Sequence, residues 1–296
     1  MNHASEQKRD SLTMAARRPS PLLRYLLGLE GLALLRGWLA RDDEAAARRV
    51  SELGALLAEG QELETALAPT ELPVREAYAA WAPSYDSQPN PLTTVEEPVV
   101  TELLADLPAG AALDAACGTG RHLRSLAALG HRAIGVDRSP EMLEVARRAV
   151  PAAELLDGDL ASLPLASESV DVAICALALS HLPELRAPIR ELARVLRPGG
   201  RLVTSDIHPM LSSLGGDALF TRPDGTPAFV RDAVHLHSSY LDAFAAAGLE
   251  ARRCVEPAWT SSTTAMIGKA ARRIPEALEQ ALVGLPCVLI WELERP

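Results

Sequence analysis

The chain has 296 residues, of which 48% are hydrophobic, 23% charged and 4% aromatic. A mixture of this kind supports a large buried core and excludes collagen-like and intrinsically disordered classes. The formal net charge of −10 argues against a general nucleic-acid-binding surface, because such surfaces carry clustered Lys and Arg. At about 150 residues per domain, the length predicts two domains, or one large domain with an extension.

The N-terminal part of the chain is expected to be helical beyond a short tail. Residues 1–20 are polar and lean basic, so we expect a disordered tail. In the next segment apolar residues recur at helical spacing, as at Ala46, Val50 and Leu53. We therefore expect a helical N-terminal extension over residues 21–70, whose apolar face packs either on the following domain or in a homodimer.

One apolar stretch is close to the length of a membrane span. It covers residues 21–40, but Arg24, Glu30 and Arg36 interrupt it. Central charges cost about 2.5–3.5 kcal/mol each on insertion, so three of them disfavour a span. The four cysteines show neither disulfide nor zinc-site spacing. We expect a cytoplasmic protein without a membrane or nucleic-acid partner.

Residues 71–296 are expected to form an α/β domain. Short apolar strands alternate with amphipathic helices, which predicts a Rossmann-like, doubly wound and mostly parallel sheet. Its carboxyl strand ends meet at one rim, where ligands bind. The connection around residues 206–234 matches no such element and is expected to cover the substrate. The seven predicted strands are 111–116, 132–136, 153–156, 170–176, 201–205 and an antiparallel edge near 249–255 and 288–292.

An acidic residue lies at the end of the first strand, and a glycine-bearing turn follows it. The segment 113–120 reads LDAACGTG, in which Gly118 and Gly120 let the backbone approach a ligand closely. The N–H groups at the start of the next helix favour an anionic group. A carboxylate at Asp114 would repel a pyrophosphate but accept hydrogen bonds from an ammonium. This loop therefore fits a ligand with an amino-acid end better than a dinucleotide.

Two further acidic residues follow the next strands. Asp137 ends the second strand, where a carboxylate can accept both hydroxyls of a ribose. Asp159 follows the third strand and can accept from an exocyclic amine, while Leu160 offers an apolar contact to a purine. The three loops thus match an amino-acid end, a ribose and an adenine, the order found in S-adenosylmethionine (SAM). An NAD-dependent oxidoreductase is disfavoured by Asp114 and by Leu123, which stands where the dinucleotide motif has its last glycine.

These stretches resemble the class I SAM-dependent methyltransferases, most closely the ubiquinone/menaquinone-biosynthesis-like branch that acts on small molecules. The resemblance implies methyl transfer from SAM, with release of S-adenosylhomocysteine (SAH). The expected acceptor is an oxygen or carbon of an apolar or aromatic metabolite, such as a natural product or a quinone-like compound. The resemblance spans about residues 75–256 and is carried by segments 113–120, 135–139, 158–159, 170–182 and 192–200, with WAPSYD at 81–86.

The resemblance also implies roles for matching positions. Asp114 and the glycine turn would hold the methionine moiety, Asp137 the ribose, and Asp159 with Leu160 the adenine. Ala176 would line the sulfonium, and Tyr85 would close over the cofactor. In full, the expected cofactor-binding residues are Tyr85, Asp114, Ala115, Gly118, Thr119, Gly120, Asp137, Arg138, Met142, Asp159, Leu160 and Ala176.

Methyl transfer depends chiefly on alignment, to which a general base adds about 10²–10⁴-fold for an O- or N-nucleophile. The candidate bases are His208 and His181, which follow the fifth and fourth strands at the rim. No metal is expected, because the sequence shows no clustered carboxylate or His/Cys set there. The alternative is a SAM-binding cyclase or a non-methylating SAM-binding module, because a fold does not settle chemistry.

Overall fold

The computed structural model describes residues 20–40, 42–59 and 68–296 of the chain. They form two compact units: one joins the described residues up to Ala68 with Lys269–Ala281, and the other contains Pro69–Gly268 and Leu282–Pro296. Apart from Ser20, the tail expected over residues 1–20 lies outside the described residues. Within the described ranges, no helix is long and apolar enough to cross a membrane. The domain boundaries expected from the sequence stay a prediction.

The first unit is built from helices. Helices α2 (Pro21–Gly37) and α3 (Asp43–Ala58) pack on each other and belong to this unit with α13 (Gly268–Arg273) and most of α14 (Pro275–Leu282). The cap residue Asp42 accepts a hydrogen bond from the Ala45 N–H at 2.9 Å, as an acidic N-cap should. Inside the unit, the buried Arg49 lies 3.1 Å from Glu276 and 3.8 Å from Glu30. One guanidinium thus connects three helices.

The second unit contains the predicted seven-stranded sheet, which is confirmed. The order across the sheet is β4 (Glu154–Asp157), β3 (Arg132–Asp137), β2 (Ala111–Ala115), β5 (Val170–Ala176), β6 (Leu196–Ile207), β10 (Val288–Glu294) and β9 (Glu250–Val255). The first five strands in this order run parallel, while β10 runs antiparallel to both of its neighbours. The antiparallel strand is therefore the last but one, and β9 forms the edge.

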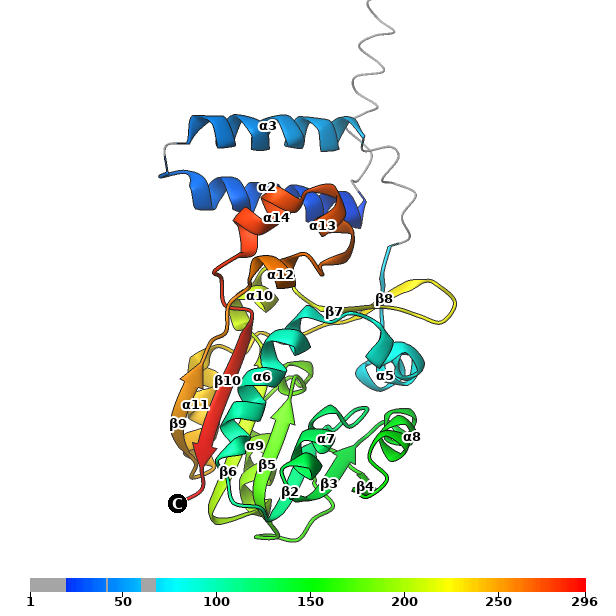
Figure 1. Cartoon of the computed structure of the whole chain (residues 1–296), viewed down its shortest axis with the longest axis vertical. Coiled ribbons are helices and arrows are strands. Elements are labelled where there is room, and N and C mark those ends of the chain that lie inside the picture. Colours follow the sequence, from blue (N-terminus) through cyan, green and yellow to red (C-terminus); the bar gives the residue numbers. More distant parts are fainter. Residues whose placement is uncertain (1–19, 41, 60–67) are drawn as a thin grey trace, which may run out of the picture. The chain divides into compact units, whose positions relative to one another are not determined.

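The central strands are covered on both faces, so they read as continuous apolar runs with no polar alternation. All five residues of β2 are buried. On one face lie α6 (Pro91–Ala105), α7 (Arg121–Ala128) and α8 (Pro140–Ala149), and on the other α9 (Arg186–Val195) and α11 (His237–Ala246) (Figure 1). Ser139 caps α8 by accepting from the Met142 N–H, with Pro140 in the first turn, as the sequence predicts.

A second, small sheet was not visible in the sequence. Its strands are β1 (Thr70–Glu71), β8 (Pro227–Val230) and β7 (Ala218–Thr221), in that order, so the connection 206–234 contains a hairpin. The hairpin packs on helix α5 (Val74–Trp81), where the Trp81 ring stacks on Phe220 with centroids 4.7 Å apart. The short helices of this unit are η2 (Ala82–Ser87), η3 (Leu179–His181), α10 (Pro209–Ser213) and α12 (Ser261–Thr264).

Candidate cofactor and active site

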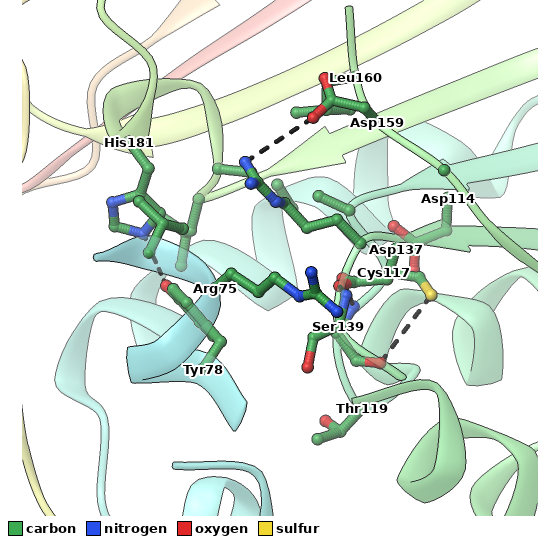
Figure 2. Close-up of a pocket in the computed structure, with 18 of the residues that line it drawn as sticks. Arg75, Tyr78, Asp114, Cys117, Thr119, Asp137, Ser139, Asp159, Leu160 and His181 are labelled. Atoms are coloured by element: carbon green, nitrogen blue, oxygen red, sulfur yellow. Dashed lines mark hydrogen bonds and ion pairs between the residues drawn. The ribbon is translucent and has the colours of Figure 1, made fainter. Parts of the chain in front are cut away.

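A pocket lies at the carboxyl ends of β2, β3 and β5, where the strand order reverses between β2 and β5 (Figure 2). Reversal points of this kind are the usual ligand sites of open α/β sheets. The structure brings most of the predicted site residues together in this pocket. They are Tyr85, Asp114, Gly118, Thr119, Asp137, Arg138, Asp159, Leu160, Ala176 and His181.

Four predicted residues do not line the pocket. Ala115 is fully buried within β2, and Met142 is buried under the first turn of α8. Gly120 is the N-cap residue of α7 and has a left-handed φ of +87°. His208 lies after β6 in a different cluster. The structure therefore separates the two histidines that were candidates for the base.

Asp114 is the most informative residue of the pocket. Its side chain is buried with 2% exposure, and its Oδ2 has no hydrogen-bond partner among the described residues. Burial raises the pKa of this carboxyl to about 6. Buried polar atoms are nearly always paired, so an unpaired oxygen on a residue that lines a pocket points to a ligand that supplies the missing donor. An ammonium such as that of a methionine moiety fits this position.

Asp137 joins the glycine turn to the next strand. Its Oδ2 accepts from the Gly118 N–H and its Oδ1 from the Ser139 N–H, both at 2.8 Å. Burial is the largest influence on the pKa of this carboxyl, which is raised. Each carboxylate oxygen keeps a second lone pair, so Asp137 retains the capacity to accept from a vicinal diol.

The turn itself has an unusual backbone. Gly118 has a φ of +52°, and a Cβ built on it would meet no atom within 4 Å. A side chain there would enter the pocket, so the glycine leaves room for a ligand. Ala116 and Leu177, which line the same pocket, also have positive φ values of +62° and +52°. Non-glycine residues in this region carry strain of about 1–2 kcal/mol, which tends to gather at functional sites.

The far end of the pocket is more open. Asp159 accepts from the Ala161 N–H at 2.9 Å and lies 3.7 Å from Arg138 Nη1. Both side chains are close to half exposed. Leu160 is partly buried beside them and offers the apolar contact expected for a purine.

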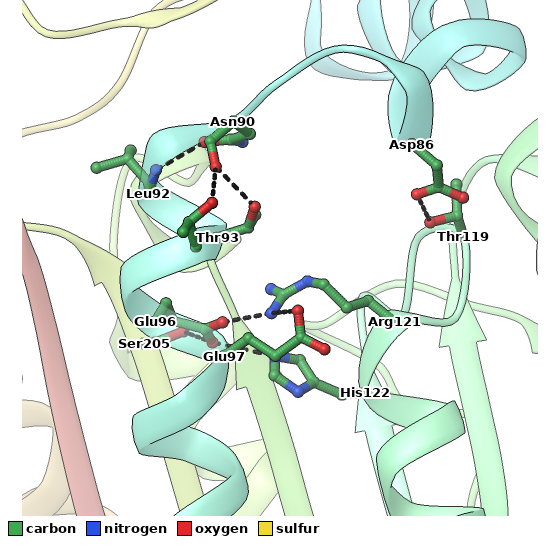
Figure 3. A network of polar contacts seen from close by, with 11 residues as sticks. Asp86, Asn90, Leu92, Thr93, Glu96, Glu97, Thr119, Arg121, His122 and Ser205 are labelled. Carbon is green, nitrogen blue, oxygen red and sulfur yellow. Dashed lines mark hydrogen bonds and ion pairs between the residues drawn. The ribbon is translucent and has the colours of Figure 1, made fainter. Parts of the chain in front are cut away.

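A buried polar network lies next to this pocket and shares Arg121 and His122 with its lining (Figure 3). Glu96 of α6 is fully buried and accepts from Arg121, from His122 Nε2 at 3.0 Å and from Ser205 Oγ at 2.7 Å. Burial opposes its ionisation, but the hydrogen bond from His122 and the charge of Arg121 lower its pKa to about 2. Glu96 therefore connects α6, the start of α7 and β6. Sequence reasoning missed it, because a lone acidic residue in a helix gives no sign of such partners.

A second network contains a predicted histidine. The Tyr78 hydroxyl lies 2.6 Å from His181 Nε2, and His181 Nδ1 lies 2.8 Å from Asp232 Oδ1, without the alignment of a hydrogen bond. Burial raises the pKa of Tyr78 well above its usual range, so this hydroxyl stays protonated. A proton on Nδ1, which faces the Asp232 carboxylate, leaves Nε2 free to accept from the Tyr78 hydroxyl. No sequence pattern indicates Tyr78 or Asp232 as partners of this histidine.

Asp206 holds the segment that carries His181. It accepts from the Ser180 N–H at 3.0 Å and from the Tyr240 hydroxyl at 2.7 Å. Burial raises the pKa of Asp206 to about 7. This carboxyl therefore fixes the backbone next to His181 and ties the end of β6 to α11.

Comparison with known proteins identifies the domain. Residues 113–204 match a family model described as a methyltransferase domain. The malonyl-[acyl-carrier protein] O-methyltransferase of Pectobacterium atrosepticum is 37% identical over 145 residues, 48% of this chain and 55% of that protein. The ubiquinone/menaquinone biosynthesis C-methyltransferase of Syntrophotalea carbinolica is 40% identical over 116 residues, 36% of this chain and 49% of that protein. The chain thus spans about half the length of these two relatives.

Solved structures share the fold at low identity. A SAM-dependent methyltransferase from Mesorhizobium loti has a TM-score of 0.53 and 22% identity, over 70% of this chain and 100% of that one. The [4+2]-cyclase SpnF has a TM-score of 0.54 and 19% identity, over 77% and 99% of the two chains. These likenesses establish the fold, and the family model adds the identity of its central segment. Residues 113–204 therefore form a methyltransferase domain, and the chain is similar in sequence and fold to class I SAM-dependent methyltransferases.

Proposed function

We propose that the protein transfers the methyl group of SAM to an oxygen of a small, largely apolar acceptor. The observation that carries this proposal is the buried, unpaired Asp114 oxygen beside the open glycine turn. SAM, when bound, supplies an electrophilic methyl group on a positively charged sulfur. In this arrangement Asp114 binds the ammonium, Asp137 the ribose, and Asp159 with Leu160 the adenine.

A proton path supports an oxygen acceptor. The acceptor hydroxyl gives its proton to the Tyr78 oxygen while Tyr78 passes its own proton to His181 Nε2, 2.6 Å away. Asp232, next to Nδ1, stabilises the imidazolium that results. The acceptor oxygen forms the new bond to the methyl carbon, and the electron pair of the broken carbon–sulfur bond stays on sulfur. Base assistance of this kind contributes about 10²–10⁴-fold.

The walls of the pocket support an apolar acceptor. Val74, Leu177 and Leu182 line it together with the Tyr78 ring. Arg75 extends from α5 across the pocket (Figure 2). An anionic group, either on the acceptor or the carboxylate of the methionine moiety, would pair with this guanidinium.

The decisive experiment has two steps. Calorimetry should detect binding of SAM and SAH, and Asp114→Asn should weaken it. Purified protein is then incubated with SAM and a panel of phenols, quinols and hydroxylated aromatic acids, followed by mass spectrometry for a gain of one CH₂ and for SAH. Absence of SAM and SAH binding would refute the whole proposal, whereas binding with methylation only at carbon would refute the oxygen acceptor.

The second candidate is a reaction guided by SAM without methyl transfer. The likeness to the cyclase SpnF shows the fold alone, but it demonstrates that this fold is not restricted to methylation. Conversion of an acceptor without stoichiometric SAH would favour this candidate. The expected cytoplasmic location and homodimer stay predictions.

A further inference from the structure

Three potential metal ligands from separate parts of the second unit lie together. His208 follows β6, His237 begins α11 and Glu256 follows β9. Nε2 of His208 lies 3.0 Å and Nε2 of His237 2.9 Å from the same Oε1 of Glu256. The three ligand atoms all lie within 4.8 Å of one another. None of these residues lines the pocket described above.

The cluster lies at the rim of the sheet. Because β10 runs antiparallel to both β6 and β9, these two strands run in the same direction and end at the same rim. His208 is nearly buried, whereas the side chains of His237 and Glu256 are 39% and 45% exposed. The contacts with His208 and His237 lower the pKa of Glu256, which holds it as a carboxylate. The cluster is thus anchored at one residue and open to solvent at the other two.

We propose that His208, His237 and Glu256 bind a divalent transition-metal ion of the zinc type. Two imidazoles and one carboxylate form a ligand set typical of Zn²⁺ with an open fourth position. Metal–ligand bonds of about 2.0–2.2 Å at tetrahedral angles separate the ligand atoms by roughly 3.3 Å. The two separations from Glu256, 2.9 and 3.0 Å, are close to this value, and the two histidine nitrogens lie within 4.8 Å of each other. The fourth position is free for water or for an oxygen or nitrogen atom of a small molecule.

The hydrogen bonds of the cluster define an alternative to metal binding. Nδ1 of His208 accepts from the Met210 N–H at 3.2 Å, so the proton of neutral His208 lies on Nε2 and points at Glu256. Metal binding at Nε2 must displace this proton and release the Met210 N–H. Metal-bound histidines usually donate from their other nitrogen. The competing account is therefore a carboxylate that accepts two hydrogen bonds and binds no metal.

The test uses the full chain without an affinity tag, freed of metal by a chelator. Calorimetric titration with ZnCl₂ should show one equivalent bound, and CoCl₂ should give the visible absorption of a low-coordinate Co²⁺ site. His237→Ala and Glu256→Gln should each weaken Zn²⁺ binding at least about 100-fold, because even indirect partners of metal ligands contribute 10–100-fold. Cys254→Ser is the matched control, since this exposed thiol is close in sequence and should not contribute.

The metal-binding test does not depend on whether the protein binds SAM. Circular dichroism and thermal melting establish that each variant is folded, and both changed side chains are partly exposed. Zn²⁺ binding that is equal in wild type, His237→Ala and Glu256→Gln, or that depends on Cys254, would overturn the site. Complete absence of Zn²⁺ and Co²⁺ binding would also overturn the site, and the cluster would then be two hydrogen bonds that Glu256 accepts. None of these results depends on methyl transfer.

Discussion

The hydroxyl of Tyr78 lies 2.6 Å from Nε2 of His181, although the two residues are 103 positions apart. Tyr78 belongs to α5, ahead of the first strand of the large sheet, and His181 ends η3, just after β5. Their contact joins the helix that covers the pocket to the rim of the sheet. The proposed proton path therefore includes Tyr78, which lies outside residues 113–204, the segment that matches the methyltransferase family model.

The proton path predicts a graded loss of activity. His181→Gln should lower kcat for an oxygen acceptor by about 10²–10⁴-fold, because no base remains to take the proton. Asp232→Asn should also lower kcat, since it removes the charge that stabilises the imidazolium. SAM affinity by calorimetry is the control, and it should stay near that of wild type. Unchanged kcat in both variants would contradict the path.

The pKa of Asp114 predicts how SAM binding depends on pH. Because burial raises this pKa to about 6 in the folded protein, the carboxyl takes up a proton as the pH falls through 6. A neutral carboxyl no longer balances an ammonium, so SAM affinity should fall by up to about tenfold per pH unit below 6. Above pH 6 it should level off. Asp114→Asn should bind about 10–100-fold more weakly and without this pH dependence.

The Glu96 network predicts a large effect on stability. Glu96→Gln should lower the free energy of unfolding by about 3 kcal/mol, because Arg121 and His122 lose the anion between them. The neighbouring Glu97→Gln is the control, since Glu97 is 44% exposed and 3.9 Å from Arg121, and it should cost under about 0.5 kcal/mol. Urea denaturation measures both. Equal effects would show that Glu96 is not the centre of the network.

The same network predicts a direction for acid unfolding. The folded-state pKa of Glu96, about 2, lies below the unfolded value near 4.3. Its contribution is therefore fully present above about pH 4.3 and is lost as the pH falls toward 2. The stability difference between wild type and Glu96→Gln should shrink across this range.

The strained turn predicts a stabilising substitution. Ala116 has a φ of +62°, so Ala116→Gly should raise the free energy of unfolding by about 0.5–1 kcal/mol, the relief of strain exceeding the entropic cost of glycine. Ala115→Gly, one position earlier in the buried β2, should instead destabilise by at least about 0.5 kcal/mol. Thermal melting compares the two. A destabilising Ala116→Gly would show that the alanine methyl contributes packing that outweighs the strain.

The exposed apolar residues of α2 and its C-terminal end test the predicted homodimer. Leu35, Trp38 and Leu39 are 65%, 72% and 72% exposed. If these helices join two copies, Trp38→Glu should shift the mass in light scattering from dimer to monomer, and the exposed Leu219→Glu, in β7, should not. A monomeric wild-type protein would end this prediction.

Local pattern was sufficient for the sheet and for most of the pocket. Apolar runs with Asp114 and Asp137 near their ends predicted parallel strands, and the carboxyl ends of parallel strands necessarily meet at one edge. That geometric necessity is why the sequence alone predicts that acidic residues far apart along the chain share one ligand. It also explains the limit, because only groups at strand ends are positioned by it.

Tertiary structure alone decided the contacts between elements. The insertion of β10 between β6 and β9 depends on long-range pairing, which leaves no local periodicity. Likewise, the partners of Glu96 and His181, and the convergence of His208 with His237 and Glu256, arise where separate helices and strands pack. A side chain carries its chemistry in its type, but its partners are set by packing between segments. The sequence therefore determined the residue types at the rim, and the fold decided which of them lie close enough for the proposed proton transfer and metal binding.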